Sequence, residues 1–155
     1  MQKTVILILF VSIFGVGHAQ RKMPNLSFQE HSLDFANANR SFDENDQFID
    51  TLRDEAIIQS IAKILTENPA LHIDLIGHVA LNEDTLLGLQ RAEKVKEMLV
   101  EKDISSERIN AESRGHRIPI INDDIIFGLA SREEREAGNQ KNRRVEVKVA
   151  AVKQE

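Results

Sequence analysis

The chain has 155 residues, a formal net charge of −5 and no cysteine, tryptophan or tyrosine. This length suits one domain, and a hydrophobic content of 41% with 29% charged residues is typical of a globular protein. The missing cysteine excludes disulfides, thiolate metal sites, a cysteine nucleophile and an acylated anchor, and the negative charge argues against nucleic acid as a partner.

The first nineteen residues have the pattern of a secretory signal peptide. Lys3 precedes an apolar stretch over residues 5–16, and the small-x-small tripeptide Gly17-His18-Ala19 follows. The apolar stretch is shorter than the roughly twenty residues that a membrane-spanning helix needs. We therefore expect residues 1–19 to be a signal peptide. We also expect the protein to be periplasmic and to have no direct membrane span. A buried N-terminal helix is the alternative.

From residue 20 onward the apolar pattern predicts alternating strands and helices. Residues 20–47 form a lead with a first strand, and residues 48–152 form the domain core. The order predicts an α/β fold, in which helices cover one face of a mixed sheet of about four strands. Apolar residues that recur every three to four positions indicate helices, and apolar residues that recur every second position indicate strands. The predicted helices span 48–67 and 85–102, and the predicted strands span 26–35, 71–77, 108–114 and 144–152.

The region between Gly115 and Asn142 gives a weaker signal. Residues 118–126 are apolar but are interrupted by Pro119 and by Asn122-Asp123-Asp124. Residues 131–140 are strongly charged and fit either a short solvated helix ended by Gly138 or a flexible loop.

Residue types that carry chemistry lack a recognisable arrangement. The four histidines outside the signal peptide do not have the spacing of a metal site, so we expect unrelated surface or loop histidines. No GxSxG nucleophile elbow is present, and the carboxylate pairs have no identifiable partner. We expect no enzymatic activity, no metal and no cofactor. The histidines are His31, His72, His78 and His116, and the carboxylate pairs are Asp123-Asp124 and Glu133-Glu134.

Two segments carry a family resemblance. The first reads Gly-His-Val-Ala at 77–80 and continues into a helix that contains Leu87, Arg91-Ala92 and Val95. The second is Asn-Arg-Arg-Val-Glu at 142–146. Together they resemble the OmpA-like peptidoglycan-binding domain family, which includes the C-terminal domain of outer-membrane protein A, peptidoglycan-associated lipoproteins and flagellar stator subunits. The resemblance extends over about 57–149 and implies an OmpA-like two-layer sandwich with two main helices on one face.

The resemblance also implies non-covalent binding of the diaminopimelate stem peptide of peptidoglycan. The free end of diaminopimelate is a zwitterion, so its site needs a fixed cation and a fixed anion. In this family a helix arginine binds the carboxylate, for which its planar guanidinium is well suited, and the aspartate of a Gly-His-Thr-Asp segment binds the ammonium. Arg91 matches the helix arginine, and Asn142, Arg143 and Arg144 match the closing motif of the site.

The chain departs from the family at the ammonium site. Ala80 stands at the position of the aspartate, and the segment before the helix is about four residues shorter than usual. Losing one charge-assisted hydrogen bond costs on the order of 1.5–3 kcal/mol. Asp84 lies seven residues before Arg91 and so shares its helix face. We hypothesise that Asp84, or Glu83 beside it, binds the ammonium. The alternative is that Asp84 only caps the helix.

Two functions follow from these observations. The first is a periplasmic module that binds the stem peptide and links envelope components to the cell wall. The second is a degenerate OmpA-like domain that serves as a protein–protein interaction or structural module without binding peptidoglycan. If the chain anchors the outer membrane to the wall, we expect it to do so through an envelope protein partner.

Overall fold

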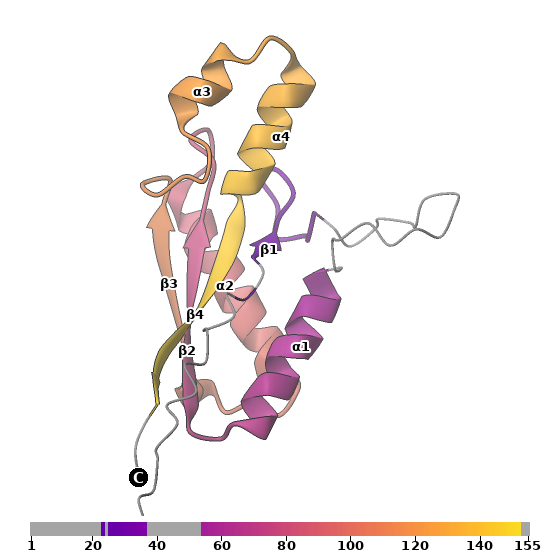
Figure 1. The fold of residues 1–155 in the computed structure, drawn as a ribbon, viewed down its shortest axis with the longest axis vertical. Coiled ribbons are helices and arrows are strands. Elements are labelled where there is room, and N and C mark those ends of the chain that lie inside the picture. The colour runs from indigo at the N-terminus through magenta and orange to yellow at the C-terminus, as the bar shows by residue number, and fades with distance from the viewer. Residues whose placement is uncertain (1–22, 24, 37–53, 153–155) are drawn as a thin grey trace, which may run out of the picture.

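A computed structural model describes residues 23, 25–36 and 54–152 of the chain. Figure 1 shows the strands side by side along the long axis of the domain, with α3 and α4 at one end. Within the described residues the elements are β1 (Leu26–Ser27), α1 (Asp54–Glu67), β2 (Leu71–His78), α2 (Thr85–Val100), a 3₁₀ turn (Ser106–Arg108), β3 (Ile109–Gly115), α3 (Asp123–Gly128), α4 (Arg132–Asn142) and β4 (Arg144–Val152).

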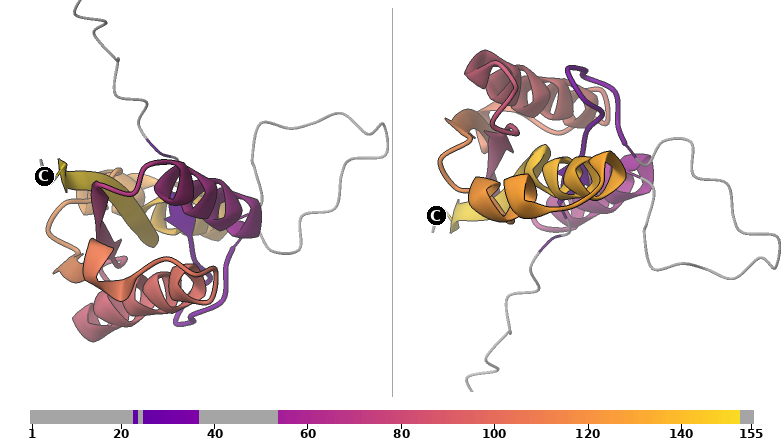
Figure 2. Two further views of the ribbon diagram at one scale, coloured as in Figure 1. Left: turned by 90° about the horizontal axis from the view of Figure 1, so that it is seen from below. Right: turned by 90° about the horizontal axis from the view of Figure 1, so that it is seen from above.

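The strands form one mixed sheet in the order β1-β4-β2-β3. β2 runs parallel to β3 and antiparallel to β4, and β1 pairs antiparallel with β4. Helices α1 and α2 lie on the same side of this sheet (Figure 2). The predicted α/β two-layer fold, with a mixed sheet of four strands and two main helices on one face, is confirmed. No helix among the described residues is long and apolar enough to cross a membrane.

The four central elements agree closely with the sequence pattern. The strands predicted over 71–77, 108–114 and 144–152 and the helix predicted over 85–102 are present, with bounds within two residues of the expectation. Helix α1 ends at Glu67, directly before Asn68-Pro69 as expected. The part of this helix predicted before residue 54, and the signal peptide predicted over 1–19, lie outside the described residues.

The hydrophobic core lies between the sheet and the two helices. β2 and β4 turn alternate side chains toward the helices, and α1 and α2 return apolar side chains at helical spacing. This burial supplies most of the stabilisation of the fold. The core residues contributed by the central elements include Ile57, Ile58, Ile61 and Leu65 of α1, Ile73 and Leu75 of β2, Ala92, Val95 and Leu99 of α2, and Val145 and Val147 of β4.

The N-terminal segment is built into the same core. The single strand predicted over 26–35 is wrong, because β1 has only two residues and the chain then turns back on itself. Phe28 and Phe35 pair across this turn, and their buried rings lie 5.0 Å apart. We call residues 25–36 the N-terminal hairpin. Asp54 at the start of α1 accepts a hydrogen bond from the backbone N–H of Ser27 at 3.1 Å, which ties α1 to β1.

The region between β3 and β4 contains two helices. The helical alternative for 131–140 is the one found, but its predicted end at Gly138 is wrong, since α4 spans Arg132–Asn142 and buries Gly138 within it. Its start is fixed by a capping box in which Ser131 and Glu134 exchange side-chain and backbone hydrogen bonds. The short helix α3 was not expected, and it buries only Ile126. The two helices stand at the end of the sheet where β2 and β3 finish and β4 begins (Figure 1).

Candidate functional site

Arg91 of α2 is fully buried, and its guanidinium is satisfied by the chain itself. Its Nη1 and Nη2 donate to the two carboxylate oxygens of Glu83 at 2.9 and 2.7 Å. Its Nε donates to the carbonyl of Ser32 at 3.1 Å, and the remaining N–H groups reach the carbonyls of Gln29 at 3.0 Å and His78 at 3.5 Å. An arginine side chain has five N–H donors. All five are therefore directed at acceptors of this chain.

Glu83 has an equally complete set of partners. Its side chain is fully buried, and beside Arg91 it accepts hydrogen bonds from the backbone N–H groups of His31 at 2.9 Å and Ala80 at 3.0 Å. Burial raises the pKa of Glu83, but the hydrogen bonds from Arg91, Ala80 and His31 and the charge of Arg91 outweigh it, so the pKa lies below its ordinary value. The carboxylate is therefore ionised at neutral pH.

The N-terminal hairpin covers this ion pair. The carbonyls of Gln29 and Ser32 bind Arg91, and Lys94, one turn further along α2, donates to the carbonyl of Leu33 at 2.7 Å. The guanidinium carbon of Arg91 also lies 5.3 Å from the centre of the Phe28 ring. The hairpin thus excludes solvent from the ion pair. The spacing of apolar residues in the sequence does not predict that the hairpin lies there.

Asp84 acts as the N-cap of α2. Its carboxylate accepts a hydrogen bond from the backbone N–H of Leu86 at 2.9 Å, and its backbone is extended, as at most N-caps. Of the two acids considered for the ammonium site, Glu83 is the one beside Arg91.

The closing motif holds neighbouring segments in place. Asn142 is buried, and its side chain accepts from the backbone of Ile120 and Ile121 and donates back to Ile121. Arg144 donates to the carbonyl of Ile118 at 3.1 Å, which fixes the same loop. Asn142, Arg143 and Arg144 of the motif are all buried and make contacts within the domain.

Arg143 connects the buried ion pair to α4. It pairs with Glu136 through two hydrogen bonds, and its Nε lies 3.9 Å from Glu83. The Glu136 side chain is 46% exposed, so the Arg143–Glu136 pair reaches the surface while the Arg91–Glu83 pair does not. The two arginines and two glutamates together carry no net charge.

His78 is also buried, at the end of β2. The expectation of a surface or loop histidine is wrong for this residue, because it is 1% exposed and lies beside Arg144 and Glu146 of β4. Burial, followed by the positive charge of Arg144, lowers the pKa of His78 to about 4, although Glu146 opposes the change. No group of three or more metal-ligating side chains occurs within residues 23, 25–36 and 54–152.

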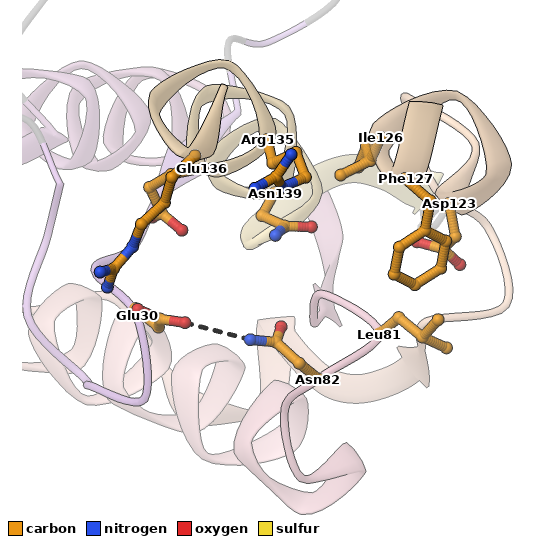
Figure 3. A pocket seen from close by; sticks show the side chains of 10 residues that line it. Glu30, Leu81, Asn82, Asp123, Ile126, Phe127, Arg135, Glu136 and Asn139 are labelled. Carbon is orange, nitrogen blue, oxygen red and sulfur yellow. Dashed lines mark hydrogen bonds between the residues drawn. The ribbon is translucent and has the colours of Figure 1, made fainter. Parts of the chain in front are cut away.

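A cavity of about 490 Å³ opens beside these charged pairs. Figure 3 shows side chains from α3 and α4 facing Leu81 and Asn82 of the loop after β2, with Glu30 of the N-terminal hairpin hydrogen-bonded to Asn82 along one edge. Glu136 lines the cavity and also binds Arg143. The cavity is therefore adjacent to the closed Arg91–Glu83 pair but separate from it.

Comparison with known proteins identifies the family. The sequence profile of the OmpA family matches residues 41–126, more than half of the chain. The chain belongs to the OmpA family. Outer membrane porin F of Pseudomonas fluorescens is 29% identical over 101 residues, which are 63% of this chain and 28% of the porin. The chain thus spans about a quarter of the length of this curated relative.

Solved structures of OmpA-like domains share the fold. The peptidoglycan-associated lipoprotein of Burkholderia pseudomallei matches with a TM-score of 0.57 and 21% identity, covering 79% of this chain and 86% of the lipoprotein. The C-terminal domain of Helicobacter pylori MotB matches with a TM-score of 0.56 and 20% identity, covering 83% and 84% of the two chains. The OmpA-like architecture expected from the two motifs is confirmed.

Position 80 differs from the family pattern that the sequence resembles. Ala80, where the resemblance predicts an aspartate, is buried and offers only its backbone N–H, which Glu83 accepts. The sequence predicts Glu83 or Asp84 as a ligand group. The hairpin carbonyls and Glu136 cannot be predicted from the two motifs, because they belong to other segments of the chain.

Proposed function

We propose that this OmpA-like domain is a non-catalytic module of the periplasmic envelope that acts through protein–protein contacts or as a structural domain. In this proposal Arg91 stabilises the fold and does not bind a ligand. The observation supporting this proposal is that all five N–H groups of Arg91 are directed at acceptors of the chain itself. A ligand carboxylate would find no free donor on this guanidinium.

The energetics of exchange support the same conclusion. A stem-peptide carboxylate at Arg91 would replace Glu83, and one bidentate carboxylate in place of another yields little net gain. Removing one partner of a buried ion pair costs about 3–5 kcal/mol. The N-terminal hairpin would also have to leave, because its carbonyls at Gln29 and Ser32 occupy two further donors.

Binding of the diaminopimelate stem peptide of peptidoglycan, which would link envelope components to the cell wall, is the second candidate function. Membership of the OmpA family favours it, as does a structural neighbour named a peptidoglycan-associated lipoprotein. The intact closing motif at 142–146 also favours it. This function requires Arg91 and Glu83 to separate when the ligand arrives.

Co-sedimentation with purified sacculi distinguishes the two functions. The double variant Arg91→Met/Glu83→Leu replaces the buried pair with apolar side chains of similar size. The matched control is Arg114→Met/Glu112→Leu, which removes an exposed pair of the same composition on β3. We expect the unaltered chain to stay in the supernatant. Retention on sacculi would contradict the proposal, and loss of that retention in the Arg91 double variant alone would establish stem-peptide binding at Arg91.

A further inference from the structure

The end of the domain around α3 presents several large apolar side chains to solvent. Phe127 is 68% exposed and Leu81 is 42% exposed, and both line the cavity of about 490 Å³. Exposed apolar groups gathered in one place mark interaction sites more often than isolated ones do. They gather here because β2 and β3 are parallel, so the loops that follow them leave the sheet at the same end.

The apolar part of the cavity is held in place by packing between α3 and α4. Ile126 also lines the cavity, but it is only 3% exposed and packs against Gly138 of α4, where a Cβ would lie 3.0 Å from its Cγ1. Ile126 therefore fixes α3 against α4 and leaves its neighbour Phe127 turned outward. The cavity thus offers an apolar surface that does not require rearrangement of the core.

The polar lining contains groups of both signs without partners. Asp123 and Arg132 have no ion pair or hydrogen bond from their side chains to the described part of the chain, and the Asn139 side-chain amide has none either. In contrast, Glu136 binds Arg143, and Arg135 donates to the carbonyl of Leu129 at 2.7 Å. One acid, one base and one amide therefore remain available around the apolar surface.

We propose that this cavity is the docking site for a protein partner, and that it takes an exposed apolar side chain flanked by one basic and one acidic residue. The apolar side chain packs between Leu81 and Phe127, the base pairs with Asp123 and the acid pairs with Arg132. This inference rests on the proposed function as an interaction module and specifies the chemistry of the partner. Buried apolar anchors with polar groups around them are the usual arrangement of such sites.

The test is an NMR titration of the ¹⁵N-labelled chain with short capped peptides. The probe is Ac-Lys-Leu-Glu-NH₂, and the peptides that remove one feature each are Ac-Lys-Ser-Glu-NH₂ and Ac-Glu-Leu-Glu-NH₂. We expect saturable shifts of backbone amides at 81–82 and 123–139 at millimolar probe, and about tenfold weaker binding when either feature is removed. Absence of saturable shifts with the probe would overturn the proposal.

Matched variants show whether the binding uses the named side chains. Phe127→Ser and Asp123→Asn are each expected to weaken binding of the probe severalfold. Ile125→Ser and Asp124→Asn change exposed neighbours on α3 outside the cavity lining and are expected to leave binding of the probe unchanged. Equal effects of the two sets would overturn the assignment.

A stem tripeptide, L-Ala-D-Glu-diaminopimelate, is titrated in parallel. If it shifts the cavity amides and Ac-Lys-Leu-Glu-NH₂ does not, protein docking is wrong and the cavity belongs to wall binding. That outcome would also contradict the proposed function, whereas absence of shifts with both peptides would overturn the docking site alone. The failure of the docking site and the failure of the proposed function therefore give different results.

Discussion

Gly77 of β2 and Gly88 of α2 face each other where the helix crosses the strand. A Cβ on Gly77 would lie 1.7 Å from the carbonyl oxygen of Gly88. Two residues without side chains thus set the close approach of α2 to the sheet. Arg91 follows Gly88 by three residues, so this approach also sets the depth at which the guanidinium lies and brings it within reach of the His78 carbonyl.

Substitution at these two glycines is expected to have unequal effects. Gly77→Ala should destabilise the fold by about 3 kcal/mol, because the obstructing atoms are backbone and cannot move aside. In Gly88→Ala the nearest atom is the side-chain Oγ of Ser113 at 2.5 Å, which can rotate, and alanine favours the helix by about 1 kcal/mol. Urea denaturation of both variants measures the difference, and equal losses would contradict the close backbone approach.

The Arg91–Glu83 pair is expected to be strongly non-additive. Arg91→Met leaves the Glu83 carboxylate buried without its counter-ion and should cost about 3–5 kcal/mol, and Glu83→Leu should cost a similar amount. The double variant should lose less than either single variant, because apolar side chains tolerate burial. Free energies of unfolding from the double-mutant cycle check this. Additive losses would mean that the two side chains do not interact.

The architecture could be predicted because local pattern and global fold agree along most of the chain. Apolar and polar residues alternate over 71–75 in β2 and over 144–149 in β4, and α2 carries a helical repeat, so these segments bury the face that their sequence indicates. The regions that were harder to interpret lack a regular apolar spacing, because residues 118–126 are interrupted by Pro119 and by Asn122-Asp123-Asp124, and residues 131–140 are strongly charged. α4 is a charged helix defined mainly by its capping box, and α3 is a helix of only six residues that buries Ile126.

The site was predictable only in part. The motif predicts Arg91 as the cation of the site, and Glu83 is one of two candidate acids. Spacing along α2 favoured Asp84 over Glu83, because spacing takes no account of the turn at 80–83 that directs Glu83 back toward Arg91. The contacts that close the site come from Gln29 and Ser32, about sixty residues away in the chain, and local periodicity carries no information about them.

The stability of the domain is expected to fall as the pH drops from 6.5 to about 4. The pKa of His78 is about 4 in the folded chain and 6.5 in the unfolded chain, so the unfolded state binds the extra proton in this interval. The stabilisation is fully present above pH 6.5 and decreases toward pH 4, by about 3 kcal/mol in total. When the pH falls below the ordinary pKa of a glutamate, Glu83 contributes a further loss of stability, because its pKa in the folded chain is also lowered.

The control for this pH dependence is His78→Leu. Neither ring nitrogen of His78 has a hydrogen-bond partner among the described residues, so an apolar side chain can replace the imidazole. Arg144, Glu146 and Lys148 are the charged neighbours of His78, and they are unchanged in this variant. The midpoints of urea denaturation at a series of pH values should lose their slope between pH 6.5 and 4. An unchanged slope would assign the effect to another group.

Two substitutions of Asp84 distinguish a role in capping α2 from a role in binding a ligand. As an N-cap, Asp84→Ala should destabilise the chain by about 1 kcal/mol, whereas Asp84→Asn should be nearly neutral, because asparagine also accepts the hydrogen bond from Leu86. An ammonium ligand needs the negative charge, so Asp84→Asn would then weaken stem-peptide binding while the stability stayed the same. Thermal melting combined with sacculus co-sedimentation measures both properties. We expect the stability to follow the capping order and both variants to stay in the supernatant, as the unaltered chain does.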